Sequence, residues 1–70
     1  MTLYQMDAKA IGKKLVVLRG EKTQEEVANA LEISVSALSM YERGERIPRD
    51  NIKIRISSYY GQPIHSIFFE

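Results

Sequence analysis

Residues 23–44, TQEEVANALEISVSALSMYERG, contain two helix-start signals in close succession. Thr23 precedes Glu26 by the spacing of a capping box, in which a hydroxyl and a carboxylate satisfy each other's backbone amides at a helix start. Ser34 is a second N-cap candidate, and Gly44 is a stop signal. Apolar residues at helical spacing follow both caps: Val27, Ala28 and Leu31, then Ala37, Leu38 and Tyr41. The stretch therefore predicts two short helices joined by a tight turn.

The segments on either side of this stretch predict further helices. Asp7 is a plausible N-cap and Gly20 a stop, and the apolar stripe between them is formed by Ala8, Ile11, Leu15 and Leu18. Between Asp50 and Gly61, isoleucines alternate with polar residues, which is the period of a half-buried strand. A strand there would lack a partner, because no other stretch alternates comparably. We therefore expect Asp50 to cap a fourth helix.

Pro63 suits the first turn of a last short helix at about residues 63–69. A chain of 70 residues can hardly bury every apolar side chain of this segment, so we expect a dimer interface formed by Ile64, Ile67, Phe68 and Phe69. The alternative is that the helix only covers the core. The apolar residues before the first helix could pack on the same surface: Leu3, Tyr4 and Met6.

The composition favours one small domain over residues 1–70, an all-α compact bundle of four to five short helices. The absence of Cys excludes disulfides and thiolate chemistry and suits a reducing cytosol, so we expect a cytoplasmic protein. The apolar runs fall far below the roughly 20 residues that a membrane span needs. His65 has no ligand cluster at metal-binding spacing, and Ser39 and Ser57 have no base to activate them. We expect no enzyme, no metal and no cofactor.

The net charge of +1 conceals a sorted distribution. Residues 7–19 carry four basic residues against one acid, and residues 43–55 carry five against two, so each segment has a local charge of +3. Residues 20–42 carry one basic residue against five acids, a local −4, although the stretch 33–40 has no charge. One surface of the molecule could therefore be basic while another is acidic. Binding the phosphate backbone of a nucleic acid needs such a concentration of positive charge.

Short helices with a capped, charge-poor second helix describe a helix-turn-helix unit at about residues 23–43. The run TQEEVANALEISVSALSMYERGERIP resembles the phage repressor and Cro-like (XRE-type) helix-turn-helix family, and the resemblance extends over about residues 11–68. The residues that carry it are Gln24, Ala28, Ile33 and Leu38, the ending Tyr41-Glu42-Arg43-Gly44, and the C-terminal pattern of Gly61, Ile64 and Ile67-Phe68.

The resemblance implies three sets of functional residues. Base contacts would come from Val35, Ser36, Ser39 and Met40, where apolar groups suit thymine methyls and hydroxyls discriminate weakly. Phosphate contacts would come from Gln24, Ser34, Arg43, Arg46, Lys14, Lys22 and Arg49. A structural ion pair would join Arg19 to Glu42.

The chain departs from the family pattern at two places that can be tested. Glu32 stands at the turn where the family usually has glycine with a positive φ, at a strain of roughly 1 kcal/mol. Asp50 and Lys53 stand where the fourth helix of the family commonly has leucines.

The resemblance implies a sequence-specific DNA-binding transcriptional regulator of the repressor type. It would bind double-stranded DNA at an inverted-repeat operator as a homodimer, with the recognition helix in the major groove. The alternative is a protein-interaction module of the same fold, an antitoxin or a regulator's partner, that uses the apolar recognition face. No small-molecule ligand and no membrane are expected as partners.

Overall fold

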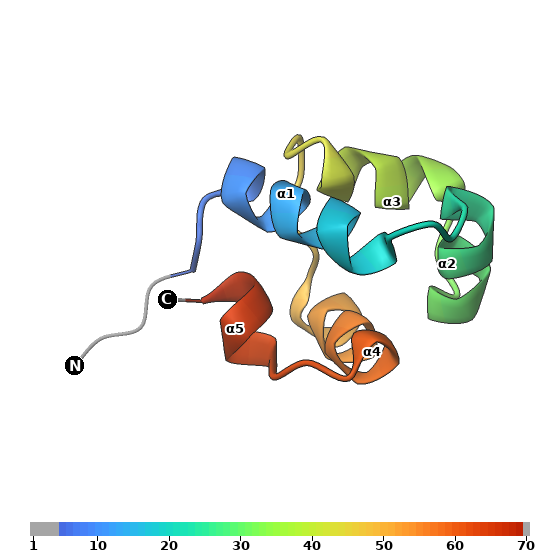
Figure 1. Ribbon diagram of the computed structural model, residues 1–70. Coiled ribbons are helices and arrows are strands. Elements are labelled where there is room, and N and C mark those ends of the chain that lie inside the picture. Colours follow the sequence, from blue (N-terminus) through green and yellow to red (C-terminus); the bar gives the residue numbers. More distant parts are fainter. Residues whose placement is uncertain (1–4, 70) are drawn as a thin grey trace.

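The computed structural model describes residues 5–69, which form five helices. They are α1 (Ala8–Arg19), α2 (Gln24–Leu31), α3 (Val35–Glu42), α4 (Asp50–Tyr60) and α5 (Ile64–Phe68). α3 packs along α1, α2 lies across one end of this pair, and α5 packs on the other side of α1, while α4 packs against α2 and α5 (Figure 1). The described residues contain no strand beyond an isolated bridge. The all-α fold is confirmed.

Side-chain caps start the first three helices as predicted. Asp7 Oδ1 accepts from the Ala10 amide at 2.9 Å, Thr23 Oγ1 from the Glu26 amide at 3.0 Å, and Ser34 Oγ from the Ala37 amide at 3.0 Å. Each acceptor satisfies an amide that has no partner within its own helix. None of the helices in residues 5–69 is long and apolar enough to cross a membrane.

The start of α4 corrects the predicted cap. Arg49 occupies the N-cap position without a side-chain cap bond, and Asp50 is the first helical residue. The Asp50 carboxylate lies 3.6 Å from the Lys53 ammonium one turn later. An acid in the first turn still stabilises a helix through the helix dipole. Asp50 therefore stabilises α4 as its first helical residue rather than as its N-cap.

The core corrects the expectation about α5. Ile67 is 2% exposed and Phe68 is fully buried, and both pack with Ile11, Leu15 and Ile56. The chain therefore buries these two side chains by itself, and they are not available to a second molecule. Ile64 and Phe69 are only partly buried.

The segment before α1 packs on α5. The Met6 amide donates to the Phe68 carbonyl at 2.7 Å, and Gln5 pairs with Phe69 in an antiparallel bridge. Met6 also contacts the core, whereas Leu3 and Tyr4 lie outside the described residues.

Lys53 explains one departure from the family pattern. Its side chain is buried, its ammonium lies 4.9 Å from the Phe69 ring centroid and 5.8 Å from that of Phe68, and it donates to Gln5 Oε1. Cations are attracted to aromatic ring faces, and the aliphatic stem of lysine fills apolar space. A lysine can therefore occupy this position because the N-terminal segment and two aromatic rings close around it.

The contacts between helices depend on two backbone features. Gly12 lets α1 approach the end of α3, because a Cβ there would stand 2.4 Å from the Glu42 carbonyl oxygen. Glu32 ends α2 in the left-handed conformation, with φ 59° and ψ 42°, as its position in the turn predicts. Together they set α2 and α3 against α1.

Candidate nucleic-acid interface

The four residues implied as base contacts lie on the outward side of α3. Val35 is 40% exposed and Ser36 is exposed, whereas Ser39 and Met40 are partly exposed. The opposite side of the helix is buried through Leu38 and Tyr41. We call Val35, Ser36, Ser39 and Met40 the reading face. It carries no charged side chain, so its chemistry is apolar contact and hydroxyl hydrogen bonding.

A buried carboxylate fixes the helix that carries this face. Glu42, whose side chain is 3% exposed, accepts from Arg19 Nε at 2.8 Å and from Gln24 Nε2 at 2.9 Å. Arg19 Nη1 also donates to the Lys22 carbonyl at 2.7 Å. The hydrogen bond to Glu42 raises the pKa of Arg19. The ion pair implied by the resemblance is therefore present, and it joins α1, α2 and α3.

Gln24 takes part in this network, although the resemblance implied a phosphate contact for it. Its side-chain amide donates to Glu42 and is partly buried. Gln24 thus has a structural role in holding Glu42. A phosphate contact by Gln24 stays a prediction.

Tyr60 lies close to the same network. Burial raises the pKa of its phenol to about 12, and the negative charge of Glu42 adds to the effect. Its hydroxyl is buried and has no hydrogen-bond partner among residues 5–69. Helical spacing places Tyr60 on one face of α4 with Ile52 and Ile56, but its closeness to Glu42 of α3 could not be predicted from that spacing.

Basic residues gather at the C-terminal end of α3 and in the loop after it. Arg43, Arg46 and Arg49 are all exposed. Arg43 pairs with Glu45, with Nε to Oε2 at 3.0 Å and Nη2 to Oε1 at 3.1 Å, and both side chains are more than half exposed. Arg46 and Arg49 line one hollow of about 390 Å³.

Lys9 joins this basic group, and sequence reasoning did not single it out. Its ammonium donates to the Arg43 carbonyl at 3.4 Å, and its chain packs against Gly44. The local charge of +3 in residues 7–19 was the only sequence feature that pointed to Lys9. Its position at the end of α3 follows from the packing of α1 on α3, which the sequence does not show.

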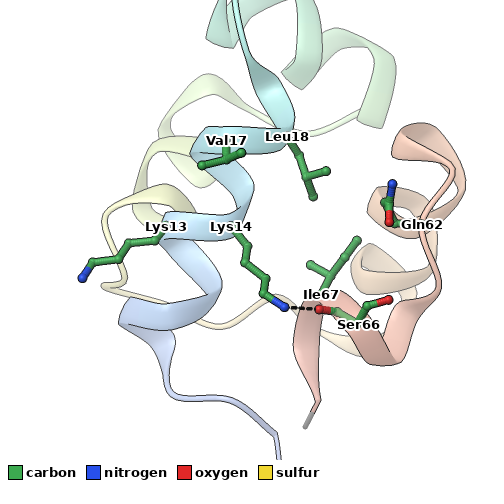
Figure 2. A pocket seen from close by; sticks show the side chains of 7 residues that line it. All are labelled: Lys13, Lys14, Val17, Leu18, Gln62, Ser66 and Ile67. Carbon is green, nitrogen blue, oxygen red and sulfur yellow. Dashed lines mark hydrogen bonds between the residues drawn. The ribbon is translucent and has the colours of Figure 1, made fainter.

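The two remaining predicted lysines lie elsewhere. Lys22 stands in the connection between α1 and α2, where its ammonium donates to the Tyr59 hydroxyl at 3.1 Å and lies 4.8 Å from the ring centroid. Lys14 faces α5 and donates to the Ser66 carbonyl. The structure thus places Lys9 at Arg43 and brings Arg46 and Arg49 to one hollow, whereas Lys14 (Figure 2) and Lys22 bond to other parts of the fold.

Comparison with known proteins agrees with this geometry. A model of the family described as Helix-turn-helix matches residues 13–67, which is most of the chain. No curated protein and no solved structure matched. The matched family provides a DNA-binding regulatory domain rather than a catalytic one. With a capped α2, a tight turn at Glu32 and an outward-facing α3, the chain belongs to the XRE-type (Cro and repressor-like) helix-turn-helix family of DNA-binding regulators.

Proposed function

We propose that this protein is a sequence-specific, repressor-type transcriptional regulator that binds an inverted-repeat operator as a homodimer. Each copy inserts α3 into the major groove. The observation that carries the proposal is the pairing of an exposed, uncharged reading face with a basic group at one end of the same helix. The reading face contacts base edges, and the basic group contacts the phosphate backbone.

The chemistry of the reading face restricts the kind of sequence it can select. Val35 and Met40 offer apolar contact, which suits the methyl group of thymine. Ser36 and Ser39 can donate or accept a hydrogen bond and discriminate less. The operator is therefore expected to contain thymines at contacted positions, and part of the selection comes from DNA shape.

The groups proposed to contact phosphates differ in the partners they already have within the protein. Arg43 must exchange Glu45 for a phosphate, and an exposed ion pair is worth only about 0–1 kcal/mol, so the exchange costs little. The Ser34 hydroxyl accepts from the Ala37 amide, and its own hydrogen can still be donated to a phosphate oxygen. Arg46 and Arg49 complete the central set, with Lys22, Lys14 and Gln24 farther from it.

Site selection from a genomic DNA pool at two salt concentrations tests the proposal. We expect an enriched inverted repeat and an affinity that falls as salt rises, because bound phosphates release counterions. Arg43→Ala should weaken binding to all sequences alike, whereas Ser36→Ala should change preference at particular base pairs. Lys13→Ala, which removes one positive charge from an exposed position of α1, is the matched control. Salt-independent binding without an enriched repeat would contradict the proposal.

One observation favours a second candidate function, that of a protein-interaction module. Val35 is 40% exposed on a face that has no charge, which also suits an apolar surface of another protein. Neutralising Arg43 and Arg46 separates the two functions. DNA binding would be lost, whereas a protein partner held by the reading face would remain bound.

A further inference from the structure

Met40 brings to the reading face a chemistry that goes beyond binding. It lies in the last turn of α3 and is partly exposed, and its thioether sulfur can be oxidised to a sulfoxide. The other three residues of the face are a valine and two serines, which carry no sulfur. A covalent change at Met40 therefore changes the surface that we propose contacts the bases.

The packing of Met40 differs from that of Met6. Met6 contacts the buried core, and its amide donates to the Phe68 carbonyl at 2.7 Å. Within residues 5–69, Met40 is not among the side chains that pack against the core. α3 is held by other residues, above all Leu38 and Glu42. A change of the Met40 side chain therefore alters the reading face and leaves the fold in place.

No thiol in the chain competes for an oxidant. The sequence has no cysteine, so the sulfur atoms open to oxidation are those of its three methionines. Met1 lies outside the described residues, and Met6 packs against the core. Among residues 5–69, Met40 is therefore the sulfur that lies on the proposed DNA-binding surface.

We propose that Met40 is an oxidation site that regulates DNA binding, with the sulfoxide as the form of low operator affinity. Hydrogen peroxide is the oxidant. The sulfur forms a bond to one peroxide oxygen, the O–O bond breaks, and the second oxygen leaves as water with both hydrogens. The sulfur loses the two electrons that the peroxide gains. The inference rests on the proposed function, because it concerns regulation of the same face.

The sulfoxide weakens binding because it makes an apolar contact polar. The thioether of Met40 suits the methyl group of thymine, whereas a sulfoxide oxygen is a hydrogen-bond acceptor. Water is displaced when α3 enters the major groove, and a methyl group offers the acceptor no donor in return. The oxygen is then buried without a partner in each copy of a dimer. The dissociation constant for the operator should therefore rise more than about tenfold.

Peptide mass mapping after graded peroxide treatment tests the oxidation step without reference to DNA. Met40 should gain one oxygen at lower peroxide doses than Met6, because Met6 is packed against the core. Circular dichroism of the oxidised protein should match that of the untreated protein. Oxidation of Met6 before Met40, or unfolding of the Met40 sulfoxide form, would overturn the inference.

Fluorescence anisotropy on the operator found by site selection tests the effect on binding. Peroxide should raise the dissociation constant of the wild type more than about tenfold. Methionine sulfoxide reductases A and B should restore it, with dithiothreitol supplying the two electrons that convert the sulfoxide to thioether and water. An oxidised protein that regains no affinity after reduction would count against a reversible switch.

Substitutions assign the effect to one sulfur. Met40→Leu retains Met1 and Met6 but has no sulfur on the reading face, so its dissociation constant should be the same before and after peroxide. Met6→Leu is the matched control and should lose affinity on oxidation as the wild type does. Met40→Gln places an uncharged polar group on the face and should bind weakly without treatment. A peroxide effect that persists in Met40→Leu would overturn the inference.

Protection by DNA is a second readout of the same contact. Met40 lies against base edges in the complex, so the operator duplex should slow its oxidation and leave that of Met6 unchanged. A scrambled duplex of equal length should protect Met40 less. Equal oxidation of Met40 in free and operator-bound protein would contradict the inference.

The inference and the proposed function fail in distinguishable ways. If the untreated protein shows no selective, salt-dependent DNA binding, the proposed function fails, and the regulation fails with it. If the untreated protein binds its operator and keeps its affinity once Met40 is oxidised, the inference alone fails.

Discussion

Glu42 is the residue on which most of the candidate interface depends. Its buried carboxylate is bound by Arg19 and Gln24, so it connects α3 to α1 and α2 at one point. Glu42→Ala should lower the free energy of unfolding by roughly 3 kcal/mol, because a partly buried arginine loses its counter-charge. Urea unfolding monitored by circular dichroism measures the change.

Glu45→Ala is the control for that prediction. It removes a carboxylate of the same kind from an exposed pair with Arg43, and it should change stability by less than about 1 kcal/mol. Equal losses in the two variants would mean that burial does not govern the effect.

Tyr60 gives the protein an alkaline sensitivity. Its folded-state pKa of about 12 exceeds the ordinary tyrosine value of 10.0, so the unfolded chain releases this proton first as the pH rises. Stability from this group is therefore highest below pH 10 and falls between pH 10 and 12. Tyr60→Phe should flatten that part of the decline, since phenylalanine does not titrate. Urea midpoints of both proteins across this pH range provide the comparison, and identical pH profiles would contradict the prediction.

At the residue scale, the sequence indicated local partners better than buried ones. The caps at Asp7, Thr23 and Ser34 follow from spacings of three residues, and the Arg19–Glu42 pair follows from the family resemblance. The burial of Lys53 and the closeness of Tyr60 to Glu42 could not be predicted, because both depend on packing between segments far apart in the chain.

At the element scale, the turns that follow α2 and α4 each contain a residue with positive φ, and only one of these two residues is a glycine. α2 ends at Glu32 with φ 59°, and α4 ends at Gly61 with φ 65°, so one turn has a side chain where the other has none. Glu32→Gly should raise the free energy of unfolding by about 1 kcal/mol, because glycine adopts positive φ without strain. Gly61→Ala should lower it by a similar amount, although a Cβ there meets no atom within 4 Å. Thermal and urea unfolding of both variants test this pair, and a shift of the same sign in both would argue against backbone strain as the cause.

The element scale also shows where pattern reasoning succeeds and where it stops. α4 forms a helix despite its alternating isoleucines, because residues 5–69 offer no strand to pair with it. Ile56 is buried whereas Ile54 is exposed, as a helical period requires and a strand period does not. The cap was predicted one residue late, because the backbone of Arg49, which has no capping side chain, takes the extended N-cap conformation.

The distribution of charge acts at the scale of the whole molecule. Glu45 neutralises Arg43 beside the reading face and would repel an approaching phosphate. Glu45→Gln should therefore raise DNA affinity about threefold, since Arg43 no longer has to give up a carboxylate to bind a phosphate. Fluorescence anisotropy at a fixed salt concentration measures the change.

Glu32→Gln is the matched control for that experiment. It makes the same change of charge in the turn between α2 and α3, at a hollow shared with Ile54 and Tyr59 of α4. An equal gain from both substitutions would show that net charge, rather than Arg43, sets the affinity.

At the scale of the whole molecule, the sequence did not show which apolar side chains of the C-terminal segment are buried. Counting apolar residues near the C-terminal end of the sequence suggested that Ile67 and Phe68 need a second chain. They are buried because α1, α4 and α5 and the segment at Met6 close around them together. Which apolar residues remain outside, such as Val17, is decided only by how all the helices meet.

The residues that hold α3 in place and those on its reading face are different sets. Ser34, Leu38 and Glu42 secure the helix through a cap, the core and a buried carboxylate. Varying the reading face therefore leaves these anchors untouched, and a library randomised at its four positions alone should consist largely of folded molecules. The domain is in this sense a scaffold that could be retargeted to new DNA sequences without being redesigned.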